Sequence, residues 1–441
     1  MDGYGTGGRD AYAVLLGLDG FGVVAVDEHD GEVEIAVQTT ADLVGCPVCG
    51  AVATPHGRRP TRVRDVAFAG RPTTLIWLKR LWRCDQQLCE QRTWSELSDQ
   101  IAARASMTER ARAVATERVG RGGESVAAVA ADLGTGWNTV MRAVRAHGTP
   151  LVDDPARLGA VAALGVDETA YLAATATHAT KFTTGLVDLT RADGHSARLL
   201  DLVEGRSGAV LSGWLAARDP GWRAGITVAA LDPFRGYATA LRATLPGATR
   251  VLDAFHVVKL GFDAVDQVRR RVQHDTLGHR GRAGDPLYGI RRVLRRGHDH
   301  HSDTSWTRLL AGLDAGDPDG QLATTWIAAQ DLRLLYLNTD PQRAAEAFYR
   351  WLAFCADSGV PELERLARTL DSWRGELLAR FTHPGISNGP TEAVNLLIKK
   401  IKRVGHGFRN FANYRLRLLL HCGVDWHTQL ATPIRGRLHG S

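Results

Sequence analysis

Five short apolar segments in the middle of the chain constrain the fold more than any other feature of its 441 residues. Segments 164–168, 182–189 and 195–203 come first, and segments 226–232 and 249–253 follow after helical stretches. Apolar runs of this length, separated by helical patterns, are typical of the strands of an α/β sheet. The sequence therefore predicts three strands, a helix, a strand, a helix and a last strand.

This order of elements is that of the ribonuclease-H-like fold, in which the first and fourth strands are neighbours. Asp167 ends the predicted first strand and Asp232 the fourth, so we expect the two carboxylates to lie close together. A single acidic residue at a strand end is more often a turn or cap residue. Residues 257–380 lack strand patterns and read as helical and basic, which predicts a helical insertion within the α/β domain.

The segment from Ser387 to Phe411 predicts a helix built around one carboxylate, Glu392. Asn388-Gly389-Pro390 is typical of a helix start, and Gly405 of a helix end. Apolar residues recur at helical spacing and predict one buried stripe formed by Val394, Leu397, Ile398 and Ile401. The opposite face carries Glu392, Asn395, Lys399 and Lys402. A solvated amphipathic helix is the alternative interpretation.

Four of the six cysteines form two pairs, Cys46 with Cys49 and Cys84 with Cys89. Thiols at this spacing in a reducing compartment favour zinc over disulfides. We expect a β-hairpin between the pairs and a closed, structural site of four thiolates for Zn²⁺. Two chance pairs of buried thiols are the alternative. Basic residues crowd this ribbon and favour a role on DNA: Arg58, Arg59, Arg62, Arg64, Lys79, Arg80 and Arg83.

Residues 106–148 predict three short helices, the last two forming a helix-turn-helix. A small-residue helix from Ser125, a turn at Gly134 and a second helix with polar and basic residues make this pattern. An ordinary helical hairpin is the alternative. The expected DNA contacts are Trp137, Asn138, Thr139, Arg142 and Arg145. Residues 149–155 predict a linker, because they include two prolines.

The net charge of +6 and the pI of about 9.1 point to an acidic partner. The sequence has no charged segment leading into an apolar run at its start and no apolar stretch long enough to span a bilayer. We therefore expect a cytoplasmic, nucleoid-associated protein that does not bind membranes.

The cysteine pairs, the helix-turn-helix and the acidic segments together resemble bacterial insertion-sequence DDE transposases, specifically the L-three insertion-sequence family. Two motifs are the most specific: Asp253-Ala254-Phe255-His256-Val257-Val258-Lys259, and the segment from Ser387 through Glu392 to Gly407-Phe408-Arg409-Asn410-Phe411. The family usually has Glu-Gly where this chain has Glu392-Ala393, and the register of the glutamate is kept.

The resemblance implies catalytic roles for Asp167, Asp232 and Glu392, with supporting roles for Glu168, Asp253, His256, Asn388 and Asn395. Converging carboxylates need cations between them, and oxygen ligands favour Mg²⁺ or Mn²⁺. The basic residues Lys399, Lys402, Arg403, Arg409, Arg415 and Arg417 would follow the DNA backbone. The implied function is binding of the terminal inverted repeats of an insertion sequence, then DNA strand cleavage and strand transfer, by a homodimer or larger homo-oligomer.

The sequence thus predicts a multidomain chain: a zinc ribbon (1–100), a helix-turn-helix (101–150), a ribonuclease-H-like α/β core (158–256), a helical insertion (257–380) and the rest of the core with the Glu-bearing helix (381–430). One alternative is a catalytically silent, transposase-derived DNA-binding repressor or end-binding protein. A zinc-dependent structural or RNA-binding protein with a coincidental acid pattern is another. Metal-dependent strand cleavage would discriminate these readings.

Overall fold

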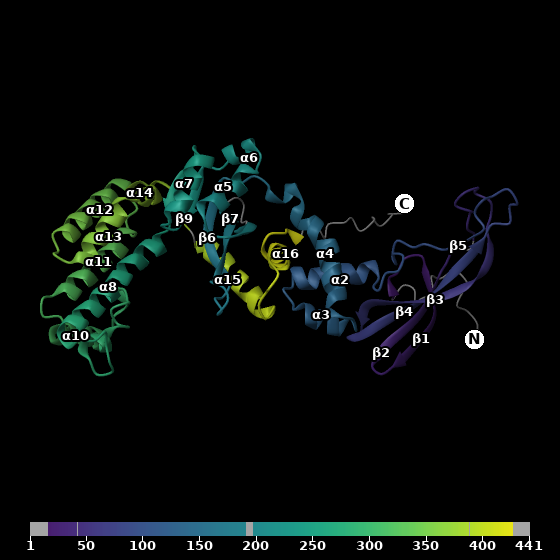
Figure 1. Cartoon of the computed structure of the whole chain (residues 1–441), viewed down its shortest axis with the longest axis horizontal. Helices are drawn as coiled ribbons and strands as arrows, with labels where there is room; N and C mark the ends of the chain where they lie inside the picture. The colour runs from purple at the N-terminus through teal and green to yellow at the C-terminus, as the bar shows by residue number, and fades with distance from the viewer. Residues whose placement is uncertain (1–15, 42, 191–196, 388, 427–441) are drawn as a thin grey trace, which may run out of the picture. The chain divides into compact units, whose positions relative to one another are not determined.

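The structure is a computed structural model that describes residues 16–41, 43–190, 197–387 and 389–426 (Figure 1). The chain divides into two compact units, one of residues 158–397 and one that combines residues 1–157 with 398–441. Helix α15 (Gly389–Val404) begins in the former and ends in the latter. No described helix is both long and apolar enough to cross a membrane.

The N-terminal part of the combined unit is a twisted sheet. Its order is β1-β2-β4-β3, with β5 added to β4, in the described residues. The strands are β1 (Phe21–His29), β2 (Glu32–Thr39), β3 (Thr54–Phe68), β4 (Arg71–Arg83) and β5 (Thr93–Ser95). Strands β3 and β4 form the antiparallel hairpin predicted between the cysteine pairs. Val37, Leu75 and Trp77 are almost fully buried and form the centre of its small core.

Asp65 links this sheet to the helices that follow it. The carboxylate is 1% exposed, accepts a hydrogen bond of 2.5 Å from Thr108 Oγ1, and forms an ion pair with Arg110. Thr108 is also the N-cap of α2, where its side chain accepts from the backbone of Ala111. A buried carboxylate with these partners holds the start of α2 against β3.

The three helices expected between residues 106 and 148 are present as α2 (Glu109–Gly120), α3 (Val126–Asp132) and α4 (Trp137–Asp153). Ser125 caps α3 by accepting from Ala128 N, and Gly134, with φ of +59°, makes the turn into α4. The predicted linker at 149–155 is wrong over residues 149–153, because α4 continues through Pro150 to Asp153. Pro150 has no backbone N–H to donate to the helix. Val152, two residues further on, is 3% exposed and packs into the core, which favours continuation of the helix.

Helix α16 (Phe411–Cys422) packs against α2 and α4 in the same unit. A Cβ atom at Gly148 of α4 would lie 2.8 Å from Leu420 Cδ1, so the two helices approach closely at this glycine. The C-terminal segment therefore belongs to the packing of the helix-turn-helix.

The other unit contains a mixed sheet of order β10-β9-β6-β7-β8 in the described residues. Its strands are β6 (Ala163–Leu172), β7 (Lys181–Asp188), β8 (Arg198–Glu204), β9 (Val228–Leu231) and β10 (Thr249–Leu252). Strands β6, β9 and β10 are parallel, and β7 is antiparallel to both β6 and β8. Helices α5 (Gly208–Ala216), α6 (Pro220–Ala224) and α7 (Arg235–Thr244) separate β8, β9 and β10.

The predicted order of strands and helices is present, with the short helix α6 added before β9, and two strand boundaries differ by three residues or more. Strand β6 continues to Leu172 because its ladder with β7 extends to the pair Leu172 and Lys181, so Asp167 lies inside the strand. Strand β8 begins at Arg198, and the predicted start of that strand at His195 and Ser196 lies outside the described residues.

The segment predicted to be helical contains only helices among its described residues. They are α8 (Ala254–Leu277), α9 (Pro286–Ile290), α10 (Asp303–Gly316), α11 (Gln321–Leu335), α12 (Pro341–Ala356), α13 (Pro361–Asp371) and α14 (Arg374–Thr382), with a 3-10 turn at His298–His300. Trp326, Trp351 and Trp373 are buried in its core. Arg269 is buried and paired with Asp266, so the basic run at 269–271 is partly structural.

Candidate active site

Asp167 and Asp232 lie side by side because their strands are paired. Val166 of β6 is in register with Leu231 of β9, and each aspartate is the next residue of its chain segment. Burial, together with the negative charge of Asp232, raises the pKa of Asp167 from its ordinary 3.8 to about 7. The two aspartates predicted to converge are therefore brought together by the sheet.

His256 joins Asp232 to Asp253. Asp253 follows β10 and is the N-cap of α8, where its Oδ2 accepts from His256 N at 3.2 Å. His256 Nδ1 lies 3.0 Å from Asp232 Oδ1 and 2.9 Å from Asp253 Oδ2. Burial opposes the charged imidazole, but the two carboxylates outweigh burial and raise the pKa of His256 to about 10. Asp232, Asp253 and His256 place ligand atoms within 4.8 Å of one another.

Helix α15 contacts the strand that carries Asp167. Asn395 is 8% exposed, and its Nδ2 donates a hydrogen bond to Asp167 Oδ2. Thr391 is 1% exposed, and its Oγ1 occupies the space where a Cβ of Gly165 would lie, at 2.5 Å. Glu392 lies between these two contact residues, in the first turn of α15, and is half-buried.

The three predicted catalytic carboxylates do not form one tight cluster. Among the described residues, the acidic group with ligand atoms all within 4.8 Å is that of Asp232, Asp253 and His256, and it does not include Asp167 or Glu392. Asn388, for which we expect a supporting role, lies outside the described residues. Glu168 supports Asp167 through its backbone N, which donates to Asp167 Oδ1 at 2.6 Å, while its side chain lies 3.4 Å from Arg206.

The predicted buried stripe of α15 is wrong at one position. Val394, Ile398 and Ile401 are buried, but Leu397 is 39% exposed, whereas Asn395 from the predicted polar face is buried. The reason is the contact with Asp167, which provides a hydrogen-bond acceptor for a buried amide. The helix start at Gly389 and its end before Gly405 are confirmed.

Sequence reasoning missed the contact of Gly165 with Thr391 and the position of Tyr237. The hydroxyl of Tyr237 lies 2.9 Å from Thr184 Oγ1, and burial raises its pKa to about 12. A glycine inside an apolar strand is a signal of close backbone approach and could have identified Gly165. No local pattern marks Tyr237.

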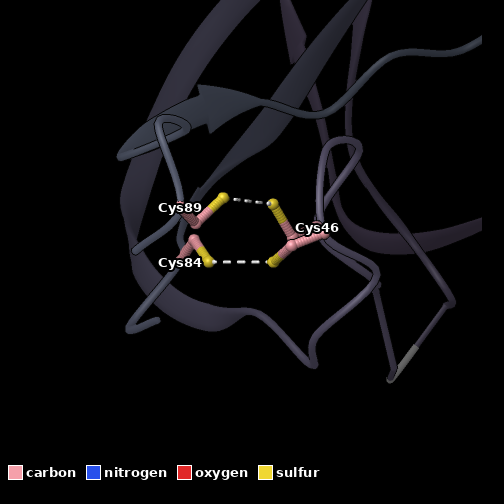
Figure 2. Close-up of side chains that lie close together, drawn as sticks. Cys46, Cys84 and Cys89 are labelled. Carbon is pink, nitrogen blue, oxygen red and sulfur yellow. Dashed lines mark hydrogen bonds between the residues drawn. The ribbon is translucent and has the colours of Figure 1, made fainter. Parts of the chain in front are cut away.

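The four paired cysteines converge in the other unit, as Figure 2 shows for Cys46, Cys84 and Cys89. Cys46 Sγ lies 3.7 Å from Cys89 Sγ, and Cys49 Sγ lies 3.6 Å from Cys84 Sγ. A tetrahedron with Zn–S bonds of about 2.3 Å has edges of about 3.8 Å, so the thiol positions fit Zn²⁺. Burial opposes ionisation of Cys46, but backbone N–H groups of Cys49 and Val48 lower its pKa to about 7.

The residues predicted to contact DNA differ in exposure. Trp137, Asn138, Arg142 and Arg145 are exposed and Thr139 is half-buried, all on α4, and Arg145 Nε donates to Asn413 Oδ1 at 3.1 Å. Lys399, Arg403 and Arg409 are exposed, and Lys402 is half-buried. Arg417, by contrast, is 3% exposed and is not a surface cation.

The basic residues of the ribbon are partly paired with acids. Arg62 pairs with Glu34, Arg64 with Glu32, Arg80 with Glu96 and Arg83 with Asp85. Arg58 and Arg59 are exposed on β3. Charge crowding in the sequence therefore overstates the positive surface of the ribbon, because four of these seven side chains face a carboxylate.

Three segments of the chain match models of known protein families. Residues 164–418 match a family model described as a transposase of the ISL3 DDE type. Residues 96–148 match the helix-turn-helix domain of transposase family ISL3, and residues 42–89 match the zinc-finger of transposase IS204/IS1001/IS1096/IS1165.

Individual relatives are also transposases. The chain is 27% identical over 416 residues to the transposase for insertion sequence element IS1001 of Bordetella parapertussis, covering 92% of this chain and 96% of that protein. It is 25% identical over 238 residues to the transposase for IS1557 of Mycobacterium tuberculosis and spans about half of that protein's length. A solved Drosophila P element transposase strand transfer complex is 10% identical, with a TM-score of 0.36, over 72% of this chain and 92% of that chain.

The match to the transposase model covers more than half of the chain and includes both aspartates, His256 and Glu392. The zinc-ribbon and helix-turn-helix matches fall on the elements already described in the other unit. The chain therefore belongs to the ISL3 family of DDE transposases.

Proposed function

We propose that this transposase binds the terminal inverted repeats of an insertion sequence and catalyses metal-dependent cleavage and transfer of DNA strands. The observation that carries the proposal is the junction of β6, β9 and α15. There, Asp167 neighbours Asp232 across paired strands and bonds to Asn395, three residues after Glu392. The proposed catalytic groups are thus Asp167, Asp232 and Glu392.

The sheet order supports a ribonuclease-H-like core. Strand β7 pairs antiparallel with β6 and with β8. On the other side of β6, strand β9 pairs parallel with β6, and β10 pairs parallel with β9. In that interpretation, the helices from α8 to α14 are an insertion between the last strand and the Glu-bearing helix. Arg250 of β10, which lies 3.4 Å from Glu376 of α14, would help to hold the insertion on the sheet.

Divalent cations fit the donor set of this site. Burial and the negative charge of Asp232 disfavour the ionised form of Asp167, and a bound cation would remove that penalty. Oxygen donors favour Mg²⁺ or Mn²⁺, which would be held by Asp167, Asp232 and Glu392. When bound, such ions activate the attacking water or 3′-hydroxyl and stabilise the leaving oxygen.

The neighbouring residues position these carboxylates. Asn395 and the backbone N–H of Glu168 each donate to a different oxygen of Asp167, which sets the orientation of that carboxylate. His256 holds Asp232 and is itself held by Asp253. Hydrogen-bonded partners of this kind orient metal ligands and reduce their conformational freedom.

Recognition of the DNA ends would fall to the helix-turn-helix. The exposed residues at the start of α4 are those that a recognition helix presents to the major groove, with Arg142 one turn further on. The exposed cations Lys399, Arg403 and Arg409 would add contacts to phosphates. Joining two ends requires two active sites, so we propose a homodimer or a larger homo-oligomer.

The test is cleavage of labelled DNA that carries the flanking terminal repeat, by the wild type and by Glu392→Gln. We expect metal-dependent nicking at the repeat boundary, lost in the variant and in EDTA, while binding to the repeat is retained. Glu346→Gln, at an exposed position on α12, is the matched control and should cleave normally.

Two outcomes would argue against the proposal. If Glu392→Gln lost DNA binding and cleavage to the same extent, the catalytic role proposed for Glu392 would be contradicted. Tight binding of paired ends by the wild type, without any cleavage, would favour a catalytically silent end-binding protein.

A further inference from the structure

A cavity of about 330 Å³ lies within the unit that contains the helix-turn-helix. Its walls are the start of α3, the start of α4, the segment Val404–Asn410 and one side of α16, and none of the described lining residues is acidic. The segment includes the Gly407-Phe408-Arg409-Asn410 motif, in which Asn410 is the N-cap of α16 and Arg409 is exposed.

Arg417 lines this cavity and is a buried cation with which no described carboxylate pairs. Its side chain is 3% exposed, its Nη2 donates to the backbone oxygen of Glu124 at 2.8 Å, and its Nε has no partner in the described part of the chain. Burial lowers the pKa of Arg417 to about 10, and no acidic side chain among the described residues opposes this shift. Burying a guanidinium whose N–H donors lack acceptors costs free energy, unless an anion accepts hydrogen bonds from them.

The loop before α16 is shaped around this guanidinium. A Cβ atom at Gly405 would lie 2.8 Å from the ring of Phe408 and 3.3 Å from Arg417 Nη1, so a larger residue there would displace these side chains. His406, with φ of +52°, and Gly407, with φ of +89°, reverse the chain. A left-handed residue other than glycine is a strained conformation that recurs at ligand sites.

The remaining walls also favour an anion. Helix α4 begins at Trp137 with Gly136 as its N-cap, and this cap has no side chain to bond the first turn. The positive end of a helix of 17 residues therefore borders the cavity. Trp137 is 46% exposed at the rim, and the exposed Arg409 lines the cavity as well.

We propose that this cavity binds a phosphate group of DNA, with Arg417 as its buried cation and Trp137 against the attached nucleotide. The inference rests on the proposed binding of DNA by the helix-turn-helix, since α4 provides one wall of the cavity. A planar, doubly donating guanidinium matches the oxygens of a phosphate, and an indole face is a stacking surface for a base. The phosphate can belong to the duplex backbone or to an unpaired nucleotide at a strand end.

The decisive variant is Arg417→Met in the full chain with zinc, which keeps the buried stem but removes the charge. We expect the free variant to melt at a higher temperature than the wild type, because it lacks a buried cation whose described partners are only a backbone oxygen and the ring of Phe408. A purely structural arginine would give the opposite result, since its bond to the Glu124 carbonyl would be lost. Arg121→Met, at an exposed arginine paired with Glu117 on α2, is the control and should change neither stability nor binding appreciably.

Inorganic phosphate is the direct probe of the cavity. Millimolar phosphate should raise the melting temperature of the wild type above that in chloride of equal ionic strength, and should not do so for Arg417→Met. Equal stabilisation of both proteins would overturn the site. This measurement needs neither DNA nor catalysis, so its failure is distinct from a failure of the proposed function.

DNA binding then identifies the source of the phosphate. Arg417→Met should weaken binding of terminal-repeat DNA about tenfold and reduce the slope of log affinity against log salt by about 0.9. A loss seen equally on blunt duplex assigns a backbone phosphate, and a loss confined to DNA with a single-stranded end assigns an unpaired nucleotide. Unchanged affinity and slope on both substrates would overturn DNA as the ligand.

Discussion

Asn395 donates a hydrogen bond through Nδ2 to Oδ2 of Asp167, and thereby joins helix α15 to strand β6. Glu392 lies three residues earlier on the same helix, so one contact links the positions of two proposed metal ligands. The bond also explains why an amide is buried on a helix whose amphipathic pattern assigns it to the exposed face.

Replacing Asn395 by alanine should reduce strand cleavage by about 10–100-fold, because the Asp167 carboxylate loses the partner that orients it. The same variant should need more Mn²⁺ for half-maximal cleavage, and its binding to terminal-repeat DNA should be unchanged. Leu396→Ala is the matched control, since Leu396 is the next residue and is 66% exposed. Normal cleavage and normal metal dependence in Asn395→Ala would contradict a positioning role.

Gly165→Ala should destabilise the protein by about 1–3 kcal/mol, because the new Cβ would overlap Thr391 Oγ1. Strand cleavage should fall as well, since the helix bearing Glu392 must move away from β6. The free energy of unfolding is measured by urea denaturation, and the double variant Gly165→Ala with Thr391→Ala should recover part of the loss.

Gly185→Ala provides the comparison for Gly165. Gly185 pairs with Asp167 across β6 and β7, but its Cβ would have only ordinary contacts at 3.7 and 3.8 Å. We expect this variant to keep near-normal stability. Equal stability of the two alanine variants would show that contact with Thr391 does not constrain position 165.

Metal binding should weaken as the pH falls through about 7. Burial and the charge of Asp232 raise the pKa of the Asp167 carboxyl to about 7 in the metal-free protein. Only the ionised carboxylate binds a cation. Below that pH, affinity for Mn²⁺ should drop about tenfold per unit, with uptake of nearly one proton when the metal leaves. Calorimetry in buffers of different ionisation enthalpy measures the protons released.

The raised pKa of Asp167 also makes the stability of the metal-free protein depend on pH. The unfolded chain loses the Asp167 proton near the ordinary value of 3.8, whereas the folded metal-free protein holds it to about 7. Between these values the folded state binds more protons, so the contribution of Asp167 to stability decreases as the pH rises. Equal Mn²⁺ affinity at pH 6 and pH 8 would refute the raised pKa.

Cys84→Ser should release the zinc ion and unfold the end of the ribbon. The four thiols are the proposed ligands, and a ribbon with so small a core depends on the metal for much of its stability. Elemental analysis should show one zinc per wild-type chain and close to none in the variant, and recognition of the DNA ends should be impaired. Cys422→Ser, in the half-buried thiol of α16, should retain zinc. Unchanged zinc content in Cys84→Ser would refute the site.

Patterns carried by nearby residues were predictable from the sequence. The cysteine spacing, the helix-turn-helix and the order of strands and helices each depend on residues within one or two elements, and the structure contains all three. The pairing of β6 with β9 followed from the order of elements and brought Asp167 beside Asp232. Pro150 misled the prediction, because the cost of a missing hydrogen bond was offset by burial of Val152.

Tertiary structure decided which side chains have partners. Asn395 and Asp167 are 228 residues apart, so no helical periodicity could show that an amide would be buried and Leu397 left partly exposed. The same holds for Arg417, which belongs to a basic helix in the sequence and to the wall of a cavity in the structure. Periodicity and spacing determined the elements and the zinc ligands, because these depend on local geometry. Packing between distant segments determined the burial, charge and orientation of the site residues, because desolvation depends on every neighbour at once.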